Sequence, residues 1–227
     1  MLARDRKTYA ATVFAEFWAQ PGRDEIATAF AIEGLVKLLQ QHRPRAIIEV
    51  GGGIGTLSRV LLDHLPAHPS GALTVLERND WCGARWVEHM GADGPRAFRL
   101  SGWPEKPYAW PDRPVDLLVV DDWLPLRYDH VEILQGQRAL VFFEGNRVIE
   151  RCIVREGLRA KGRRVATLNR RPWDRSKGYW IFRADARIWE RLWWGARTLA
   201  GRLLDGLVCQ FLGVRPGWRR RDVNSNA

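Results

Sequence analysis

The stretch that decides the fold reads Ala46-Ile-Ile-Glu49-Val50-Gly51-Gly52-Gly53-Ile54-Gly55-Thr56-Leu57. An apolar run ends beside an acidic residue, glycines follow at alternate positions, and a helical pattern begins directly after them. Glycine permits a tight turn and close approach of the backbone to a ligand, and the first turn of a helix offers N–H groups without intrahelical partners. This stretch therefore predicts a strand, a ligand-binding turn and a helix.

A phosphate group would also suit such a turn, so the nucleotide-binding motifs are the first alternatives. The frame G-x-G-x-x-G ends on Thr56 when it starts at Gly51, and on Ser58 when it starts at Gly53. Gly-Lys-Ser and Gly-Lys-Thr are both absent from the sequence. The stretch fits neither the dinucleotide-binding fingerprint nor a P-loop.

Outward from this stretch, short apolar runs alternate with helical patterns, which is typical of βα units in a mostly parallel sheet. Seven strands are predicted, at 46–50, 73–77, 97–100, 115–121, 139–144, 164–169 and 179–183. Helices are predicted near 25–41, 55–64, 81–90, 128–135 and 148–161, the first capped by Asp24. Because the last two strands are joined by a connection too short for a crossover helix, they should pair antiparallel. The predicted fold class is α/β, a doubly wound seven-stranded sheet that is mostly parallel, with the last strand antiparallel.

The chain divides into a core domain and a C-terminal addition. Residues 1–183 are predicted to form one domain, in which 1–23 is an N-terminal cap segment. Residues 184–212 have the apolar spacing of an amphipathic helix, and 213–227 form a basic, flexible tail. The helix is expected either to pack on the core or on a second subunit of a homodimer, or to contact a membrane surface through 187–221, where tryptophans and arginines would meet anionic lipid.

Composition narrows the class of protein. The 227 residues are 46% hydrophobic and 27% charged, which excludes a disordered, collagen-like or coiled-coil chain. The formal net charge is +10, but almost all basic residues are arginines and they are spread along the chain. A nucleic-acid partner is therefore not expected from charge alone.

The cysteines and the N-terminus bear on location. The three cysteines are far apart in the sequence and predict neither a disulfide nor a zinc site. The charged N-terminus predicts no secretory signal, and no apolar run is long enough to span a bilayer. The expected location is cytoplasmic. If the amphipathic helix contacts a membrane, the protein is expected at the inner membrane face.

The pattern E-x-G-x-G-x-G, with Glu49 before the glycines, resembles the first motif of the class I S-adenosylmethionine-dependent methyltransferases. The resemblance covers about residues 25–183 and implies a Rossmann-like methyltransferase fold. It implies that the methionine part of S-adenosylmethionine lies over Gly51, Gly53 and Gly55, with Glu49 near its amino group. Glu77 closes the next strand, where a carboxylate accepts the ribose hydroxyls.

The same resemblance places the adenine near Ser101, Gly102 and Trp103, which follow the third predicted strand. Trp103 has the apolar face needed to stack on a purine. Trp81, just after the ribose-binding candidate, is an alternative cover for the ring. The alternative is that either tryptophan only packs in the fold and contacts no ligand.

Polar residues follow the fourth and fifth predicted strands, at the sheet edge where ligands bind in open α/β folds. Asp121 and Asp122 follow the fourth strand, and Glu144 ends the fifth. This arrangement looks most like the catechol O-methyltransferase group, whose members bind a magnesium ion here. Carried over residue by residue, the resemblance implies Asp121, Glu144 and Asn146 as Mg²⁺ ligands.

Two departures from that group stand in the sequence. Gly145 separates Glu144 from Asn146, and no lysine follows Asp121 within the next several residues to serve as the general base of the group. Without a metal, the carboxylates of Asp121, Asp122 and Glu144 are the candidate general bases, and His130 is another.

The predicted function is an S-adenosylmethionine-dependent methyltransferase that methylates a hydroxyl of a small-molecule or glycan-type acceptor. The acceptor pocket is expected to form from the loops after strands four and five, the 170–178 loop and the N-terminal segment with Phe14, Phe17 and Trp18. Arginines in these loops, among them Arg147, suit an anionic or sugar-like acceptor. The alternatives are an RNA methyltransferase, and a non-catalytic protein of the same fold that binds a partner or membrane through its C-terminal helix.

Overall fold

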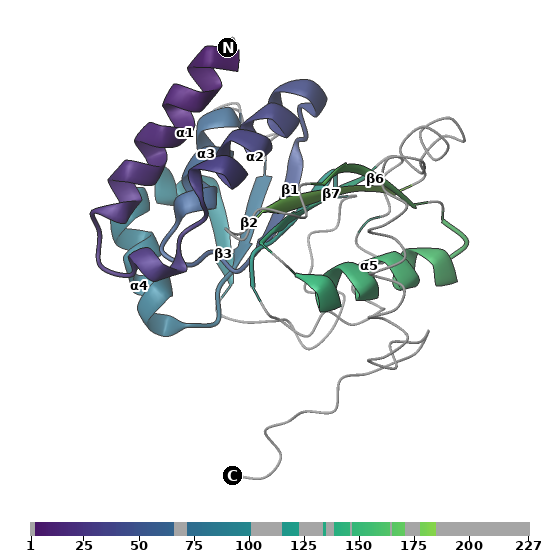
Figure 1. The fold of residues 1–227 in the computed structure, drawn as a ribbon. Helices are drawn as coiled ribbons and strands as arrows, with labels where there is room; N and C mark the ends of the chain where they lie inside the picture. Colours follow the sequence, from purple (N-terminus) through teal and green to yellow (C-terminus); the bar gives the residue numbers. More distant parts are fainter. Residues whose placement is uncertain are drawn as a thin grey trace.

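A computed structural model of the chain describes residues 3–65, 72–100, 115–122, 134, 139–145, 147–163, 165–170 and 178–184. Within these ranges seven strands form one sheet, in the order β3-β2-β1-β4-β5-β7-β6 (Figure 1). Strand β7 pairs antiparallel with both β5 and β6, and the other pairs are parallel. The strands are β1 (Ala46–Val50), β2 (Ala72–Leu76), β3 (Ala97–Leu100), β4 (Leu117–Val120), β5 (Leu140–Glu144), β6 (Val165–Arg170) and β7 (Tyr179–Ala184). The predicted α/β sheet with an antiparallel last strand is confirmed.

Helices cover both faces of this sheet (Figure 1). Four of them pack with one face of the strands in a single hydrophobic cluster, and α5 packs with the other face in a second cluster. Alternate residues of a strand enter opposite clusters, as the side-chain period of two requires: Ile47 belongs to the first and Ile48 to the second. The helices are α1 (Ala3–Trp18), α2 (Ala29–His42), α3 (Thr56–His64), α4 (Asp80–Met90) and α5 (Val148–Ala160), with 3-10 turns η1 (Arg23–Glu25) and η2 (Gly91–Arg96).

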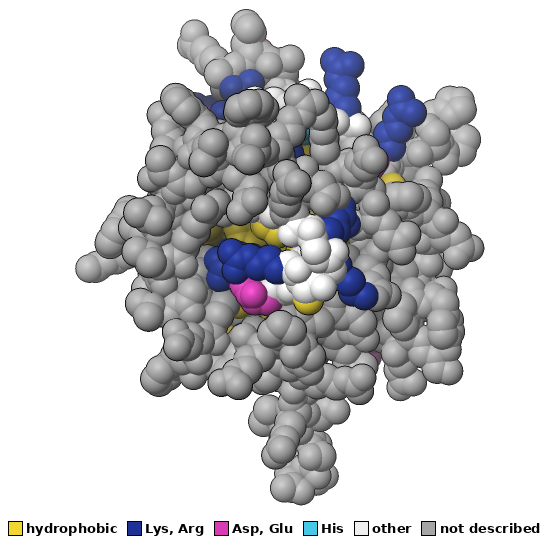
Figure 2. Space-filling model, turned by 90° about the vertical axis from the view of Figure 1, so that its right-hand side faces the viewer, with side chains coloured by type: hydrophobic (Ala, Val, Ile, Leu, Met, Phe, Trp, Pro, Cys, Tyr) yellow, Lys and Arg dark blue, Asp and Glu magenta, His cyan; other side chains and the backbone are white. Residues whose placement is uncertain are grey.

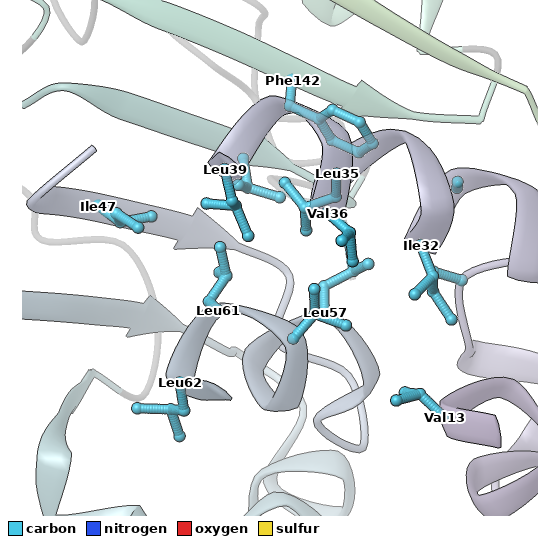
Figure 3. Packing of buried hydrophobic residues seen from close by; sticks show 14 of the residues in the cluster. Val13, Ile32, Leu35, Val36, Leu39, Ile47, Leu57, Leu61, Leu62 and Phe142 are labelled. Atoms are coloured by element: carbon cyan, nitrogen blue, oxygen red, sulfur yellow. The ribbon is translucent and has the colours of Figure 1, made fainter. Parts of the chain in front are cut away.

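In the first cluster, α2 packs against α3. Figure 3 shows Leu35 and Leu39 of α2 facing Leu57 and Leu61 of α3. All four side chains are at most 4% exposed. Burial of each such leucine contributes about 1.5–3 kcal/mol to folding. This packing fixes α3, and with it the glycine turn from which α3 starts.

The N-terminal part differs from the sequence prediction. Residues 3–18 form a full helix, α1, where only a cap segment was expected, and Ala10, Val13 and Phe17 bury one side of it. The following helix starts at Ala29 and is capped by Thr28, whose hydroxyl accepts a hydrogen bond from the Ala31 N–H at 3.2 Å. Asp24 lies in η1 instead, because Gly22 in a left-handed conformation turns the chain before it. The prediction of Asp24 as the cap was wrong.

The remaining expectations for the fold have mixed outcomes. The helix predicted at 128–135, the amphipathic helix at 184–212 beyond β7, and the tail at 213–227 lie outside the described residues. Cys82 is free and buried, but Cys152 is disulfide-bonded, which corrects the prediction of no disulfide. Separation in the sequence does not limit which cysteines a fold brings together. In the described part of the chain, no helix is long and apolar enough to cross a membrane.

On the described surface, acidic side chains lie among the basic ones. On the face that Figure 2 shows, basic side chains (dark blue) lie directly beside acidic ones (magenta). On α5, Arg159 pairs with Glu156 with an N–O distance of 2.7 Å. In the described part of this surface, basic side chains thus have acidic neighbours.

Candidate functional site

A pocket of about 330 Å³ lies at the carboxyl ends of β1, β2, β4 and β5. This is the edge of the sheet where open α/β folds bind ligands, on both sides of the position where the strand order reverses. The segments that follow the four strands supply most of the lining, and the chain before α2 supplies the rest. The lining residues are Asp24, Ile26, Gly51, Gly53, Glu77, Arg78, Asn79, Cys82, Asp121, Asp122, Glu144 and Arg147.

The glycine turn forms one wall of this pocket. Gly51 has a φ of +83°, and a Cβ there would lie 2.5 Å from the Cβ of Asp122 and 2.8 Å from the carbonyl carbon of Asp121. Only glycine lets the turn after β1 pass so close to the turn after β4. Gly51 and Gly53 both line the pocket, and their contact with the cofactor stays a prediction.

Gly55, the third glycine of the pattern, packs against α4. Its φ is +105°, and a Cβ there would lie 2.7 Å from Cε of Met90 and 3.3 Å from the Trp86 ring. It precedes α3 and lets this helix pack close to α4, and it is not among the lining residues. Gly55 is therefore placed to shape the turn from behind rather than to form the pocket wall.

Glu77 joins the turn to the neighbouring strand end. It follows β2 directly, lines the pocket and is only 5% exposed. Its Oε2 accepts a hydrogen bond from the Gly53 N–H at 2.7 Å, and its Oε1 accepts one from the Asn79 N–H at 2.6 Å. Burial raises the pKa of Glu77, and the two backbone hydrogen bonds oppose this rise. Each carboxylate oxygen retains a second lone pair, with which it can accept a ligand hydroxyl.

Glu49 lies deeper than the resemblance suggested. It is fully buried in β1 and is not among the residues that line the pocket. The Ser58 hydroxyl donates to its Oε2, and the Trp86 Nε1–H donates to the Ser58 oxygen at 2.6 Å. The other oxygen, Oε1, has no hydrogen-bond partner among the described residues. Burial, together with the nearby charges of Asp121 and Glu77, raises the pKa of Glu49 well above its usual value, against the effect of the Ser58 hydrogen bond.

Three predicted catalytic residues meet at the other side of the pocket. Asp121 and Asp122 follow β4, Glu144 ends β5, and all three line the pocket. Both aspartates pair with arginines. Nη2 of Arg147 donates to Oδ1 of Asp121 at 3.1 Å and to its backbone oxygen at 2.8 Å, and Nε of Arg78 lies 3.3 Å from Oδ2 of Asp122.

Two of the three residues predicted to hold magnesium, Asp121 and Glu144, lie among the described residues. In the described part of the chain, no group of three His, Cys, Asp or Glu side chains is placed to hold a metal ion. Asp121 already bonds the guanidinium of Arg147. Asn146, the third predicted ligand, lies outside the described residues, as do His130, Ser101, Gly102 and Trp103. The roles predicted for these five residues stay predictions.

The N-terminal segment reaches the pocket through two residues that the sequence analysis did not assign to the site. Asp24 and Ile26, next to η1, line the pocket. Of the aromatic residues expected there, Phe17 lies in the core and Trp18 is 48% exposed. Asn79 was also missed, although its side chain caps α4 by accepting from the N–H groups of residues 81 and 82. The sequence signal for Asn79 is an Asn one residue before a helical pattern.

Trp81 was an alternative cover for an adenine ring. It lies in the first turn of α4 and is 46% exposed. A Cβ on Gly22 would lie 2.8 Å from its ring, so the ring packs against the chain that leads from α1 into η1. Trp81 is not among the lining residues, although its neighbour Cys82 is.

The comparison with solved structures shows the fold. No family model matches the chain, and no curated protein matches its sequence. Among solved structures, a methyltransferase from Podospora anserina with S-adenosylhomocysteine (SAH) bound aligns with a TM-score of 0.56 and 14% identity, over 79% of this chain and 93% of that one. An O-methyltransferase from Bacillus cereus in complex with SAH aligns with a TM-score of 0.53 and 13% identity, over 79% and 90%. The chain therefore has the Rossmann-like fold of the class I S-adenosylmethionine-dependent O-methyltransferases.

Proposed function

We propose that this protein is an S-adenosylmethionine-dependent methyltransferase that methylates a hydroxyl group of a small-molecule acceptor. The observation that carries the proposal is the wall formed by Gly51, Gly53 and Glu77, where two glycines and a buried carboxylate face one pocket at the ends of β1 and β2. Side chains at the glycine positions would fill the space that a ligand needs. The structural neighbours named above support the same reading, because both were crystallised with the product form of this cofactor.

The charges of the pocket suit this cofactor. The lining includes the carboxylates of Asp24, Glu77, Asp121, Asp122 and Glu144 against the guanidinium groups of Arg78 and Arg147. S-Adenosylmethionine carries a sulfonium and an ammonium group against a single carboxylate, so an acidic pocket attracts it. Glu49 is fully buried and lies outside this lining, so its predicted place near the ammonium group stays a prediction.

The cofactor, when bound, supplies an activated methyl group on a sulfonium sulfur. The residues of this chain then have three tasks. Gly51 and Gly53 give the ligand access to the backbone, and Glu77 accepts hydrogen bonds from the ribose hydroxyls while it holds the Gly53 N–H. The carboxylates of Asp121, Asp122 and Glu144 accept the proton of the acceptor hydroxyl. Alignment of the acceptor oxygen with the methyl group provides the rest of the rate enhancement.

The finer parts of the proposal concern the acceptor and the C-terminal segment. We keep a glycan-type hydroxyl as an alternative acceptor, because arginines near the pocket suit sugar-like or anionic groups. Contact of residues 187–221 with a membrane surface or with a second subunit, and a cytoplasmic location, are proposals that rest on the amphipathic pattern and composition of the sequence alone.

Isothermal titration of the full chain with S-adenosylmethionine tests the function. We expect stoichiometric binding at micromolar Kd, and at least tenfold weaker binding by Gly53→Ala, which adds a methyl group to the pocket wall. Gly91→Ala is the matched control: Gly53 has a φ of 52° and Gly91 a φ of 48°, but Gly91 ends α4, away from the pocket lining. Equal losses in both variants, or no binding by folded wild-type protein, would contradict the proposal.

A further inference from the structure

A second cavity lies at the amino edge of the sheet, where β1, β4 and β5 begin, opposite the proposed cofactor pocket. Its volume is about 410 Å³. Because β7 runs antiparallel to β5, Arg183 near the end of β7 pairs with Leu140 at the start of β5, and both line this cavity. Of its described lining residues, four are basic, His42, Arg43, Arg45 and Arg183, and one is acidic, Asp116. We call this cavity the basic pocket.

The carboxylate in the basic pocket is engaged by the backbone. Oδ2 of Asp116 accepts hydrogen bonds from the N–H groups of Arg45 and Ala46, at 2.8 Å and 3.1 Å. The side chains of Arg43 and Arg45 are exposed, and within the described ranges no hydrogen bond or ion pair holds either guanidinium. Nη2 of Arg183 lies 3.4 Å from Nδ1 of His42. Several cations with so little opposing charge attract an anion, and guanidinium groups suit a phosphate in particular.

Arg43 has an unusual backbone conformation. It is the C-cap residue of α2, with a φ of 48° and a ψ of 53°, and in the described part of the chain no other residue except glycine has a positive φ. Glycine adopts this left-handed conformation without strain and is the usual residue after a helix. The helix dipole favours a cation at the end of α2, but it does not account for Arg45, beyond the helix end, or for Arg183 on β7. A shared anionic ligand accounts for all three arginines.

A cavity of about 440 Å³ adjoins the basic pocket and is lined in part by apolar side chains. The two cavities share Arg43 and Pro44. Leu39, Ile47 and Leu65 belong to the lining of the adjoining cavity. A ligand with an anionic head and an apolar part therefore meets complementary groups on the two sides of Arg43, whereas a free phosphate would use the basic pocket alone.

The chain leaves the last described strand beside the basic pocket. Ala184, which ends β7, directly follows Arg183, and the sequence with amphipathic spacing at 184–212 begins there. We propose that Arg43, Arg45 and Arg183 bind the phosphate group of an anionic lipid, so that the amino edge of the sheet faces a membrane surface. The proposed cofactor pocket then opens at the edge that is turned away from the membrane. This inference does not depend on the proposed methyltransferase activity.

The first test is co-sedimentation of the full chain with vesicles of phosphatidylcholine alone or of phosphatidylcholine with phosphatidic acid. We expect the wild type to bind only the vesicles with phosphatidic acid, and Arg43→Gln/Arg45→Gln to bind them about tenfold or more weakly, because each arginine near an anionic surface strengthens binding. The control is Arg85→Gln/Arg159→Gln, which removes two arginines that form ion pairs on α4 and α5 and gives the same net charge.

The control variant should bind within twofold of the wild type. Equal losses in the two double variants would show that vesicle binding follows net charge alone, and would overturn the inference. So would a wild type that binds neither kind of vesicle, or that binds both equally well.

Calorimetry with two soluble probes separates a lipid from a free phosphate. The probes are inorganic phosphate and a short-chain phosphatidic acid below its micelle concentration. We expect the wild type to bind the lipid about tenfold or more tightly than phosphate, because acyl chains reach the apolar side chains of the adjoining cavity. Arg43→Gln/Arg45→Gln should lose this binding. Equal affinity for the two probes would overturn the lipid as the source of the phosphate, and binding of neither would overturn the site.

Arg43→Gly separates ligand binding from the stability of α2. Glycine relieves the left-handed backbone, so the free energy of unfolding in urea should not fall, while binding of the short-chain lipid should weaken about tenfold. Unchanged lipid binding by this variant would show that Arg43 serves only the end of the helix. Cofactor binding by the Arg43 variants should equal that of the wild type, because the two pockets lie at opposite edges of the sheet. A folded wild type that binds the lipid but no S-adenosylmethionine would contradict the proposed function and support this inference.

Discussion

The two halves of the pocket are built in different ways. At β1 and β2 the contacts run between backbone and side chain: Glu77 binds two backbone N–H groups, and Gly51 touches the turn after β4. At β4 and β5 they run between charged side chains, in the pairs Arg147–Asp121 and Arg78–Asp122. A turn held by backbone contacts depends on glycine and cannot accept a side chain, whereas ion pairs can exchange one charged partner for another. Under the proposed function, the first half suits the cofactor and the second suits the acceptor.

Gly51→Ala should have the largest effect, because it breaks the glycine half at its tightest contact. The added Cβ would meet Asp122 at 2.5 Å on a backbone with a φ of +83°. Backbone strain alone costs about 1–3 kcal/mol, and the clash adds to it. We expect the free energy of unfolding in urea to fall by more than this strain and cofactor binding to be lost. Gly162→Ala is the control, because Gly162 has a φ of +70° and nothing within 4 Å of its Cβ position. A smaller loss in Gly51→Ala than in Gly162→Ala would contradict the close packing of the two turns.

Glu77→Gln should weaken cofactor binding by about 10-fold to 100-fold, since it removes a charged acceptor worth about 1.5–3 kcal/mol. The amide group also turns a donor toward one of the two N–H groups that Glu77 binds. Calorimetry with SAH measures the change. Glu88→Gln on α4 alters a carboxylate that pairs with Arg85 on the surface, and its SAH affinity should stay within twofold of wild type. Unchanged SAH binding by Glu77→Gln would remove this residue from the proposed cofactor half.

Glu49→Gln should change how the free energy of unfolding depends on pH. Burial first, and the charges of Asp121 and Glu77 after it, raise the pKa of Glu49 in the folded protein above its usual value of 4.5. The folded state therefore holds this proton more tightly than the unfolded state, and the contribution of Glu49 to stability is present below pH 4.5 and is lost as pH rises toward the folded pKa. The amide side chain of the variant does not titrate. The free energy of unfolding of the wild type, relative to that of the variant, should fall as pH rises above 4.5.

Urea unfolding of both proteins at a series of pH values measures this difference. Stability curves that stay parallel across the pH range would show that the pKa of Glu49 is not raised by folding. Ser58→Ala gives a second reading, because the Ser58 hydrogen bond opposes the rise of the Glu49 pKa. Its loss should extend the pH range over which stability declines.

Arg78→Gln should have the smallest effect. Its side chain is 58% exposed, and its pair with Asp122 has an N–O distance of 3.3 Å. Exposed pairs of this kind contribute about 0.2–1 kcal/mol, and salt screens them. We expect a loss of less than about 1 kcal/mol in unfolding free energy, and less at high salt, as measured in urea. A loss that does not decrease with added salt would show that this pair behaves as a buried interaction.

The sheet could be predicted closely because its signal is local. The bounds of β1 and β3 agree with the prediction, and β2 differs by one residue, so that Glu77 follows the strand instead of ending it. A run of apolar residues between turn signals is enough to indicate a buried strand. The start of α2 was predicted less well, since Asp24 and Thr28 are both good N-cap residues and the turn at Gly22 decides between them.

The two halves of the pocket also differ in how well their residues could be predicted from the sequence. Gly51, Gly53 and Glu77 could be selected from the sequence because their spacing is a local pattern, and all three line one pocket. Gly55 belongs to the same pattern, but its task depends on Met90 of a later helix. The pairing of Arg147 with Asp121 joins residues 26 positions apart, and nothing in either segment alone selects the partner. Interactions between distant side chains depend on the three-dimensional arrangement, which residue spacing does not contain.

A crystal structure of the full chain with SAH bound tests the central claim most directly. We predict that the ribose hydroxyls lie within hydrogen-bonding distance of the Glu77 carboxylate, with the homocysteine part over Gly51 and Gly53 and with Arg147 still bonded to Asp121. SAH bound elsewhere, or a ribose without contact to Glu77 in a fully occupied site, would contradict the assignment of the glycine half of this pocket as the cofactor site.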